Sequence, residues 1–388
     1  MTMKAGGEAA AATGSRAEGP RDAKKPRGRT KRRAPTRTVS VGGVMIGGKN
    51  PIPIQSMTNT NTADAASTIR QIRELEDVGC DIARVAVPNI EAARALGAIK
   101  KSVGIPIVAD IHFDYRLALE SIRQGVDKVR INPGNIGGRD NVKQVADAAR
   151  ARGIPIRVGV NAGSLDRLLL EKYGGATAEA LVESALSQAE MLNMCGFYDI
   201  VISIKATDVF LTVDACRLLA QKKTGIPQHI GMTEAGGPIS GTVKSTIGLY
   251  ELLREGIGDT LRVSLTGDPA AEVAAAKELL RTLRLGPGRS GGGGVELISC
   301  PTCGRCQIDL VRIAEEVERR VCRIKTEKPI KVAVMGCAVN GPGEAREADL
   351  GIAGGQGKAL LFKRGKPQYQ VAEAELVETL MRELEALL

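Results

Sequence analysis

The stretch Gly104-Ile-Pro-Ile-Val-Ala-Asp-Ile-His112 shows the unit from which most of this chain is built. A glycine and a proline end a helical segment, and a short β-branched run then leads to polar residues. After another helical pattern, Asp127-Lys-Val-Arg-Ile-Asn-Pro-Gly134 repeats the arrangement. Short apolar runs bounded by turn residues are typical of buried parallel strands.

Working outward, the same unit recurs between residues 40 and 284. The predicted strands cover residues 52–58, 81–88, 105–112, 127–134, 154–161, 199–206, 227–234 and 260–267. Helical patterns between them include 65–78, 89–101, 141–152, 178–194, 209–223, 243–255 and 270–283. Eight strands alternating with helices over about 245 residues predict a (β/α)8 TIM barrel. An open doubly wound sheet would need a Gly-rich phosphate-binding turn after the first strand, and the sequence has none there.

Polar side chains stand at the predicted strand ends, where a TIM barrel forms its active site. They are Arg84, Asp110, His112, Arg130, Asn132, Arg157, Asn161, Lys205, Glu234, Arg262 and Ser264. One such charge could be a salt bridge at the rim, but buried strands are otherwise apolar, so the whole set predicts a functional mouth. Arginine binds phosphate oxygens in a bidentate manner, so a small molecule carrying a diphosphate is the expected ligand.

Beyond the Gly-rich stretch 285–294, two cysteine loops stand out. Cys300-Pro-Thr-Cys303-Gly-Arg-Cys306 is the first, and Met335-Gly-Cys337-Ala-Val-Asn-Gly-Pro-Gly-Glu344 is the second. Thiolates at this spacing suit an iron–sulfur cluster or zinc, and spacing alone does not choose between them. Glu344 is a candidate oxygen ligand. We predict a site in an α+β module spanning 295–388, in preference to buried free cysteines.

Composition sets further limits. No apolar run approaches the ~20 residues of a membrane helix, so we expect a soluble protein. Eight cysteines without a secretory signal pattern predict a reducing, cytoplasmic location. Cys80, Cys195, Cys216 and Cys322 lie in apolar contexts and are predicted to be inert core residues. Only two histidines occur, His112 and His229, which excludes a histidine-rich metal site.

The net charge of +10 is concentrated at the N-terminus. Residues 1–40 hold eleven basic and three acidic side chains, a net of +8, which leaves about +2 for the body. A tail of this composition cannot offset its ordering entropy, so residues 1–37 are predicted to be a disordered, solvated extension. Nucleic acid is an unlikely ligand for the body, which lacks stacking aromatic residues.

The motifs at the mouth and in the cysteine loops together resemble those of the bacterial 4-hydroxy-3-methylbut-2-enyl diphosphate synthase family. The matching stretches are Pro53-Ile-Gln-Ser-Met-Thr58, Arg84-Val-Ala-Val-Pro88, Ala109-Asp-Ile-His-Phe113, Arg130-Ile-Asn-Pro-Gly-Asn-Ile-Gly137, Gly159-Val-Asn-Ala-Gly-Ser-Leu165, Thr233-Glu-Ala-Gly236, CPTCGR from Cys300 and GCAVNGPGEA from Gly336. The resemblance covers residues 38–388 and leaves out the tail. The chain lacks the large insertion of the plant-type form.

The resemblance implies a [4Fe–4S] cluster held by Cys300, Cys303, Cys337 and Glu344, with Cys306 not a ligand. It implies a C-terminal module like the cluster module of sulfite and nitrite reductases. The reaction implied is reductive opening and dehydration of 2-C-methyl-D-erythritol 2,4-cyclodiphosphate. Reduced flavodoxin or ferredoxin would supply electrons. A head-to-tail homodimer would bring each cluster to the other chain's barrel.

Site roles are also implied by the resemblance. Glu234 would act as acid or base. The diphosphate contacts would be Arg84, Arg130, Arg157, Asn161, Lys205, Arg262 and Ser264. Asp110 and His112 would position substrate or serve a structural hydrogen-bond network. Two alternatives stay open: a zinc-stabilised nucleic-acid-binding protein, and a non-redox barrel enzyme acting on a phosphorylated substrate.

Overall fold

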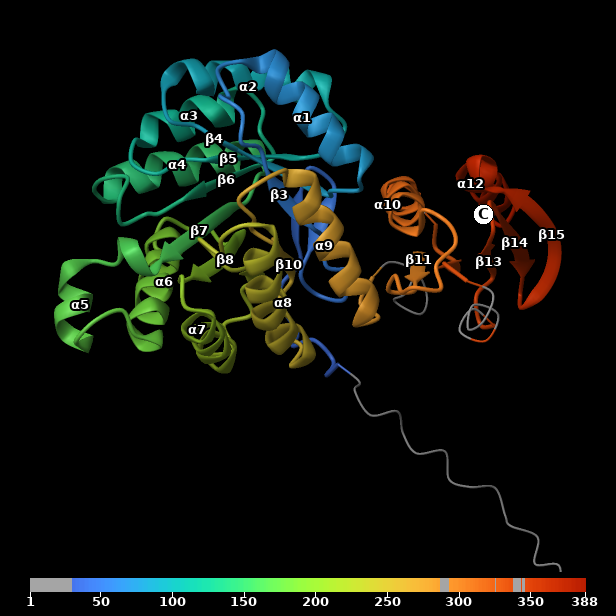
Figure 1. Cartoon of the computed structure of the whole chain (residues 1–388). Helices are drawn as coiled ribbons and strands as arrows, with labels where there is room; N and C mark the ends of the chain where they lie inside the picture. The colour runs from blue at the N-terminus through green and yellow to red at the C-terminus, as the bar shows by residue number, and fades with distance from the viewer. Residues whose placement is uncertain (1–29, 287–292, 325, 338–342, 344–345) are drawn as a thin grey trace, which may run out of the picture.

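The computed structural model describes residues 30–286, 293–324, 326–337, 343 and 346–388. Figure 1 shows a larger α/β unit, blue to yellow-brown, beside a smaller C-terminal unit in orange and red. The mouth of the larger unit and the cysteine loops of the smaller one carry the predicted functional residues.

Parallel strands form the centre of the larger unit. They are β3 (Gln55–Met57), β4 (Ile82–Ala86), β5 (Ile107–Asp110), β6 (Lys128–Ile131), β7 (Ile156–Asn161), β8 (Ile200–Lys205), β9 (His229–Ile230) and β10 (Thr260–Leu261). Strands β3 to β8 pair in chain order as one sheet, and β9 pairs with β10. Parallel bridges Ile54–Leu261 and Ile202–Gln228 connect these two sheets at both sides. This curled parallel sheet confirms the predicted α/β fold.

Helices cover the outside of the sheet. They are α1 (Ala65–Asp77), α2 (Ile90–Ser102), α3 (Tyr115–Arg123), α4 (Arg139–Arg152), α5 (Arg167–Tyr173), α6 (Ala178–Asn193), α7 (Val209–Gln221), α8 (Pro238–Arg254) and α9 (Pro269–Thr282), with the 3-10 turn η1 (Ala162–Ser164). Asp, Asn or Thr side chains cap the first turn of most of them, which fixes where they begin. No range was predicted for α3 or α5, although buried Leu117, Ala118 and Ile122 give α3 an apolar face.

Successive side chains along each strand point alternately outward, toward the helices, and inward, toward the barrel interior. Outward-facing residues such as Val129, Ile131 and Val158 are fully buried against the helices in one apolar cluster. Inward-facing residues on the same strands include Arg130 and Arg157. The helix–sheet layer therefore holds the core together, and the barrel interior is left for polar side chains.

A hairpin of β1 (Val39–Val41) and β2 (Val44–Ile46) covers the N-terminal ends of the strands, with Val41 and Ile46 packed on Ile82 and Val108. The opposite, C-terminal ends of the strands form the mouth.

Residues 30–37 were expected to belong to the disordered tail, but in the structure they contact the barrel. The backbone N–H of Lys31 donates to Arg254 O at 2.9 Å, and that of Arg37 donates to Gly225 O at 2.7 Å. Arg33 Nε lies 3.6 Å from Asp259 Oδ1. Composition alone did not show these partners, because they lie more than 180 residues away along the chain.

The smaller unit is an α+β sandwich. Its strands are β11 (Gly294–Ser299), β12 (Pro329–Met335), β13 (Leu350–Gly355), β14 (Lys358–Lys363) and β15 (Lys366–Ala372); its helices are α10 (Leu310–Val321) and α12 (Leu376–Glu385), with the 3-10 turn η2 (Glu373–Glu375). Strands β11 to β13 are parallel, and β13 to β15 are antiparallel. Apolar residues of α10 and α12 pack against this sheet.

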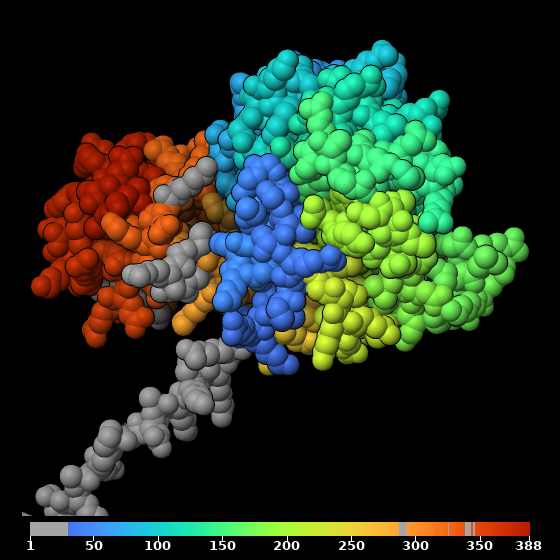
Figure 2. Space-filling view, turned by 180° about the vertical axis from the view of Figure 1, so that it is seen from behind, coloured from blue at the N-terminus to red at the C-terminus, as the bar shows by residue number. Residues whose placement is uncertain are grey.

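Polar contacts from α9 join the two units. Lys277 Nζ donates to Cys322 O at 2.6 Å, and Arg281 Nη1 lies 3.0 Å from Glu296 Oε2. Both cations belong to the C-terminal half of α9, which points away from the mouth because α9 begins after β10. Figure 2 shows the C-terminal unit, orange and red, at one side of the barrel. In the part of the chain that the structure describes, no helix is long and apolar enough to cross a membrane.

Candidate active site at the barrel mouth

Asp110 connects three basic side chains at the mouth. It ends β5 and is only 6% exposed. Arg130 Nη1 donates to Asp110 Oδ1 at 3.1 Å, while Arg84 Nε and His112 Nε2 lie 3.8 Å and 3.5 Å from Oδ2. Arg130 Nη1 also lies 3.0 Å from His112 Nε2. One carboxylate thus fixes the relative positions of side chains from β4, β5 and β6.

Asp110 stays ionised in this setting. Burial by itself would raise the pKa of Asp110, but Arg84, the hydrogen bond with His112, and Arg130 lower it more strongly. The pKa of Asp110 is therefore well below its ordinary value. Asp110 acts as a permanent counter-ion that keeps the arginine side chains aligned.

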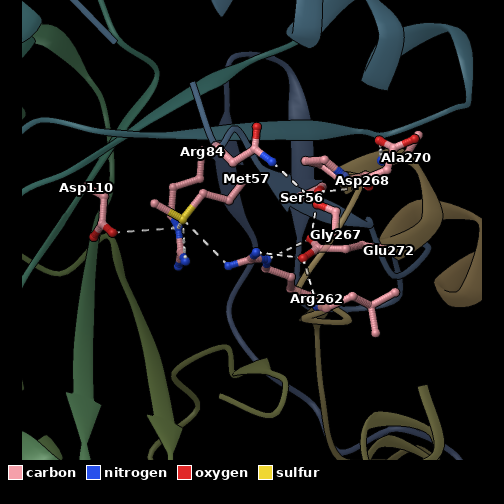
Figure 3. A network of polar contacts seen from close by, with 12 residues as sticks. Ser56, Met57, Arg84, Asp110, Arg262, Gly267, Asp268, Ala270 and Glu272 are labelled. Carbon is pink, nitrogen blue, oxygen red and sulfur yellow. Dashed lines mark hydrogen bonds and ion pairs between the residues drawn. The ribbon is translucent and has the colours of Figure 1, made fainter. Parts of the chain in front are cut away.

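A second acid, Glu272, holds Arg262 from the other side of the mouth. Arg262 donates twice to the Glu272 carboxylate, at 2.8 and 3.0 Å. Ser56 Oγ also donates to it at 2.8 Å. Figure 3 shows the Met57 thioether between Arg262 and Arg84, whose Nη2 lies 2.9 Å from the sulfur. Sequence reasoning missed Glu272, although an acid in the first turn of the helix after the last strand was a usable signal.

The remaining cations are buried with less compensation. Arg157 on β7 is 1% exposed, and its Nε and Nη1 have no hydrogen-bond partner among the described residues. Lys205 ends β8 and is 7% exposed. Burial lowers the pKa of both groups, and so does repulsion from the neighbouring cations, Arg84 first. Burial also lowers the pKa of Arg84, to about 10.

The cationic side chains at the mouth outnumber the two acids Asp110 and Glu272. Unpaired buried charge is costly, so a surplus of positive charge at an open mouth fits an anionic ligand. Asn161, at the end of β7, and Ser264, after β10, are half-buried at the same end of the barrel. The structure thus brings the predicted phosphate contacts to one end of the barrel.

Arg130 reaches Asp110 by crossing the backbone of Gly159. A Cβ atom at Gly159 would lie 2.2 Å from Arg130 Nε, and Arg130 Nη2 donates to Gly159 O at 3.3 Å. The absence of a side chain at this position of β7 is therefore a requirement of the site.

Gly159→Ala is expected to displace Arg130 and to weaken binding of inorganic pyrophosphate by about tenfold, because one bidentate cation is lost from the anion site. Isothermal titration calorimetry measures this change. Gly97→Ala on the outer helix α2 is the matched control, since its added methyl would come closest to the amide oxygen of the Gln124 side chain, which can move aside. Equal affinity in Gly159→Ala and the control would contradict the prediction.

Glu234 has an unusual backbone conformation. Its φ is 52°, in the left-handed region, where a non-glycine residue is disfavoured by roughly 1 kcal/mol or more. Thr207 Oγ1, from the segment after β8, donates to Glu234 Oε2 at 2.9 Å. Both side chains are exposed, so among the described residues this hydrogen bond is the one contact that orients the Glu234 carboxylate. Sequence reasoning found Glu234 but not Thr207, which carries no charge.

Both cysteine loops begin at the C-terminal ends of strands in the sheet of the smaller unit. Cys300 follows β11 directly, Cys337 follows β12, and these two strands are parallel neighbours. The N–H of Gly336 donates to Cys300 Sγ at 3.3 Å. A Cβ atom at Gly336 would lie 2.6 Å from Cys306 Sγ, so glycine permits this close approach of the two loops.

The free thiols differ in their surroundings. Cys303 is exposed, and the backbone N–H of Arg305 lowers its thiol pKa. Cys306 Sγ donates instead to Ile308 O at 3.2 Å. Burial raises the pKa of Cys80 and Cys216 to about 12, which keeps these thiols protonated.

The predicted ligand set remains a prediction. Glu344 lies outside the described residues, and among those that are described no group of three or more His, Cys, Asp or Glu residues is arranged to hold a metal ion. The donor chemistry nevertheless fits an iron–sulfur cluster, because free cysteines follow the adjacent strands β11 and β12 and the sulfur of one of them, Cys300, accepts a backbone N–H.

The larger unit is an α/β barrel with a cationic mouth, and the smaller unit carries two cysteine loops. This combination defines a class of two-domain barrel proteins whose mouth suits small phosphorylated ligands. Residues 36–277 match the GcpE TIM-barrel domain, and residues 296–386 match the GcpE protein C-terminal domain. The chain belongs to the 4-hydroxy-3-methylbut-2-en-1-yl diphosphate synthase family, as the sequence motifs indicated.

Three relatives carry the name 4-hydroxy-3-methylbut-2-en-1-yl diphosphate synthase (flavodoxin). The protein of Caldanaerobacter subterraneus subsp. tengcongensis is 57% identical, covering 92% of this chain and 98% of the relative. That of Clostridium acetobutylicum is 56% identical, covering 91% and 99%. That of Geobacter sulfurreducens is 55% identical, covering 92% and 99%. These comparisons give no support to the zinc-dependent nucleic-acid-binding or non-redox alternatives.

Proposed function

We propose that this chain reduces 2-C-methyl-D-erythritol 2,4-cyclodiphosphate to 4-hydroxy-3-methylbut-2-enyl diphosphate. Two electrons and two protons enter, the ring C–O bond to phosphate breaks, and one hydroxyl leaves as water. The names of the relatives point to this product and to flavodoxin as electron donor. The observation that carries the proposal is the surplus of buried cations at the mouth, which suits the negative charge that develops on the diphosphate when one of its two C–O bonds breaks.

The mouth residues divide into two roles in this proposal. The diphosphate is held by Arg84, Arg130, Arg157, Asn161, Lys205, Arg262 and Ser264. Asp110 and His112 orient this set, since both contact Arg130. Because Asp110 and Glu272 hold Arg84, Arg130 and Arg262 in place before the ligand arrives, little reorganisation of these side chains accompanies the developing charge on the leaving phosphate oxygen.

We assign the second domain to a [4Fe–4S] cluster, held by Cys300, Cys303, Cys337 and Glu344. When bound, this cluster would pass the two electrons of the reaction, one at a time, from the reduced external donor to the substrate. Cys306 is left out of the ligand set, in agreement with its sulfur contact to Ile308 O. We further propose that this domain resembles the cluster module of sulfite and nitrite reductases.

The domain boundaries follow from this assignment. We propose a substrate-binding barrel at 38–284, a linker at 285–294 and a cluster domain at 295–388, preceded by the basic segment 1–37, of which residues 30–37 contact the barrel. The two family matches, at 36–277 and 296–386, support the division.

Glu234 is the proposed acid or base. Its carboxylate would hold or move a proton at the substrate hydroxyl that leaves as water. Thr207 supports this role by fixing one carboxylate oxygen, Oε2. The left-handed backbone at Glu234 is consistent with a side chain placed for chemistry at a stability cost.

Thr207→Val is expected to lower kcat by about three- to tenfold, because the Glu234 carboxylate loses its hydrogen-bond donor. Steady-state turnover of the cyclodiphosphate measures the change. Thr207→Ser keeps the hydroxyl and should restore most of kcat. A Thr207→Val enzyme with wild-type turnover would remove this hydrogen bond from the account.

A head-to-tail homodimer is also part of the proposal. Within one chain, the contacts between α9 and the cluster domain come from the C-terminal half of α9, which lies away from the mouth. Exposed apolar side chains stand instead around the mouth: Phe113, Leu168, Phe210 and Ile239. Such side chains are typical of a covered surface. The cluster domain of the partner would cover them. Sedimentation velocity of the holoprotein should give a dimer, and a monomer that retains full turnover would contradict this arrangement.

The direct test uses anaerobically reconstituted full-length protein, reduced flavodoxin and the cyclodiphosphate, with the product identified by mass spectrometry. The proposal predicts 4-hydroxy-3-methylbut-2-enyl diphosphate in proportion to the electrons consumed. Absence of this product from protein with full cluster content would contradict it.

A further inference from the structure

Below the mouth, several polar side chains face the barrel interior, where this fold usually has branched apolar side chains, alongside apolar residues such as Val108. Lys128 and His229 are completely buried, and Gln55 and Arg157 are each 1% exposed. Their strand neighbours Val129, Ile156, Ile230 and Ile54 belong to the outer apolar clusters, so these four residues face inward. Lys128 lies two residues before Arg130 on β6 and is therefore one layer deeper than the mouth.

These buried groups lack partners. Lys128 Nζ, Arg157 Nε and Nη1, both ring nitrogens of His229 and both amide atoms of Gln55 have no hydrogen-bond partner within the described residues. The acids of the mouth contact other cations: Asp110 contacts Arg84 and Arg130, and Glu272 contacts Arg262. Arg157 at the mouth and Lys128 one layer deeper, on the neighbouring strands β7 and β6, are thus cationic side chains without a hydrogen-bonded acid among the described residues, and they are defined here as the cationic floor.

The positive charges of the cationic floor repel one another and the neighbouring cations. Burial lowers the pKa of Lys128, and repulsion from Arg157 and then Arg84 adds to this effect. Burial lowers the pKa of His229 as well, followed by repulsion from Arg157, Lys205 and Lys128. An apolar side chain of similar length at position 128 would stabilise the fold better. Folding therefore gives no reason for a lysine here.

We propose that Lys128 is a positioning residue of the anion site, which acts through Arg157 and adds positive charge beneath a bound diphosphate. This inference rests on the proposed function, in that the mouth must bind a diphosphate group. Lys128 does not touch the ligand, because Arg157 on the neighbouring strand β7 lies nearer the mouth: the strand register pairs Arg157 with Arg130, not with Lys128.

The proposal predicts two effects of opposite sign for Lys128→Met in the full-length holoprotein. The melting temperature of the ligand-free protein should rise by about 2–6 °C, because an unpartnered buried cation is removed. The affinity for inorganic pyrophosphate, measured by calorimetry, should fall by about tenfold or more, because a charge one side-chain layer away acts in a low effective dielectric. A residue with only a structural role would not give this combination.

Ser245→Ala is the matched control. Ser245 lies on α8, is completely buried, and its Oγ also lacks a partner in the described part of the chain. Its removal should leave pyrophosphate affinity unchanged, which separates the loss of charge from the loss of an unpartnered polar atom. Lys128→Gln is a second variant for the case in which Lys128→Met does not fold, and it should show the same loss of affinity.

The outcomes are distinguishable from those of the proposed reaction. Wild-type affinity for pyrophosphate in Lys128→Met or Lys128→Gln would overturn the role of Lys128, even if the cyclodiphosphate is turned over normally. A wild-type protein that binds no pyrophosphate would also overturn it. Pyrophosphate binding that depends on Lys128, together with no turnover of the cyclodiphosphate, would support the floor and contradict only the proposed reaction.

Discussion

Cys337→Ser is expected to reduce turnover of the cyclodiphosphate to below about 1% of wild type, with loss of iron and sulfide. A serine hydroxyl is a much poorer ligand for iron than a thiolate, and the loop after β12 places Cys337 beside the strand that leads to Cys300. Iron and acid-labile sulfide assays on anaerobically purified protein measure the loss. Cys300→Ser and Cys303→Ser should behave in the same way.

Cys306→Ser is the control for this series. Its sulfur donates to Ile308 O at 3.2 Å, a contact that a serine hydroxyl can also make. The variant should retain iron, sulfide and most of the turnover. Equal loss of iron in Cys306→Ser and Cys337→Ser would show that the predicted ligand set is wrong.

Glu234→Gln is expected to lower kcat by about 10²- to 10⁴-fold while the cluster content stays unchanged, because an amide cannot transfer the proton. The amide keeps the size of the side chain and can still accept the hydrogen bond from Thr207. The left-handed backbone conformation at residue 234 should therefore be the same in the variant and the wild type. Single-turnover assays with iron quantified on the same sample measure the effect.

The control for Glu234→Gln is Glu251→Gln. Glu251 lies on the outer helix α8, where it accepts a hydrogen bond from Arg217, and its loss should affect turnover by less than about twofold. Normal turnover in Glu234→Gln would remove this carboxylate from the chemistry and would direct attention to Asp110 and His112.

Much of the barrel could be predicted from the sequence, because buried parallel strands and amphipathic helices leave local patterns. The charged strand ends were found for the same reason: Arg84, Arg130 and Lys205 stand out within apolar runs. Lys128 had the same signal, since it shares a face with Arg130. It was not predicted as a site residue because it lies inside the strand, below the strand end where this fold forms its active site.

Other features depend on contacts between distant parts of the chain. Ser56 and Glu272 are 216 residues apart in sequence, so no local pattern could pair them. Thr207 is an ordinary loop residue until the fold places it 2.9 Å from Glu234. Residues 30–37 have the composition of a disordered tail, yet the barrel supplies backbone partners for them. The sequence carried residue types, whereas these pairings required the three-dimensional structure.

The central claim is that three cysteines and Glu344 hold a [4Fe–4S] cluster that serves the cationic mouth. The most direct test is the Mössbauer spectrum of ⁵⁷Fe-labelled protein purified under strict anaerobiosis. We expect about four irons per chain, one of them distinct from the other three because its protein ligand is not a thiolate. A spectrum with all four irons equivalent would contradict the predicted ligands, and a protein containing stoichiometric zinc without sulfide would contradict the cluster itself.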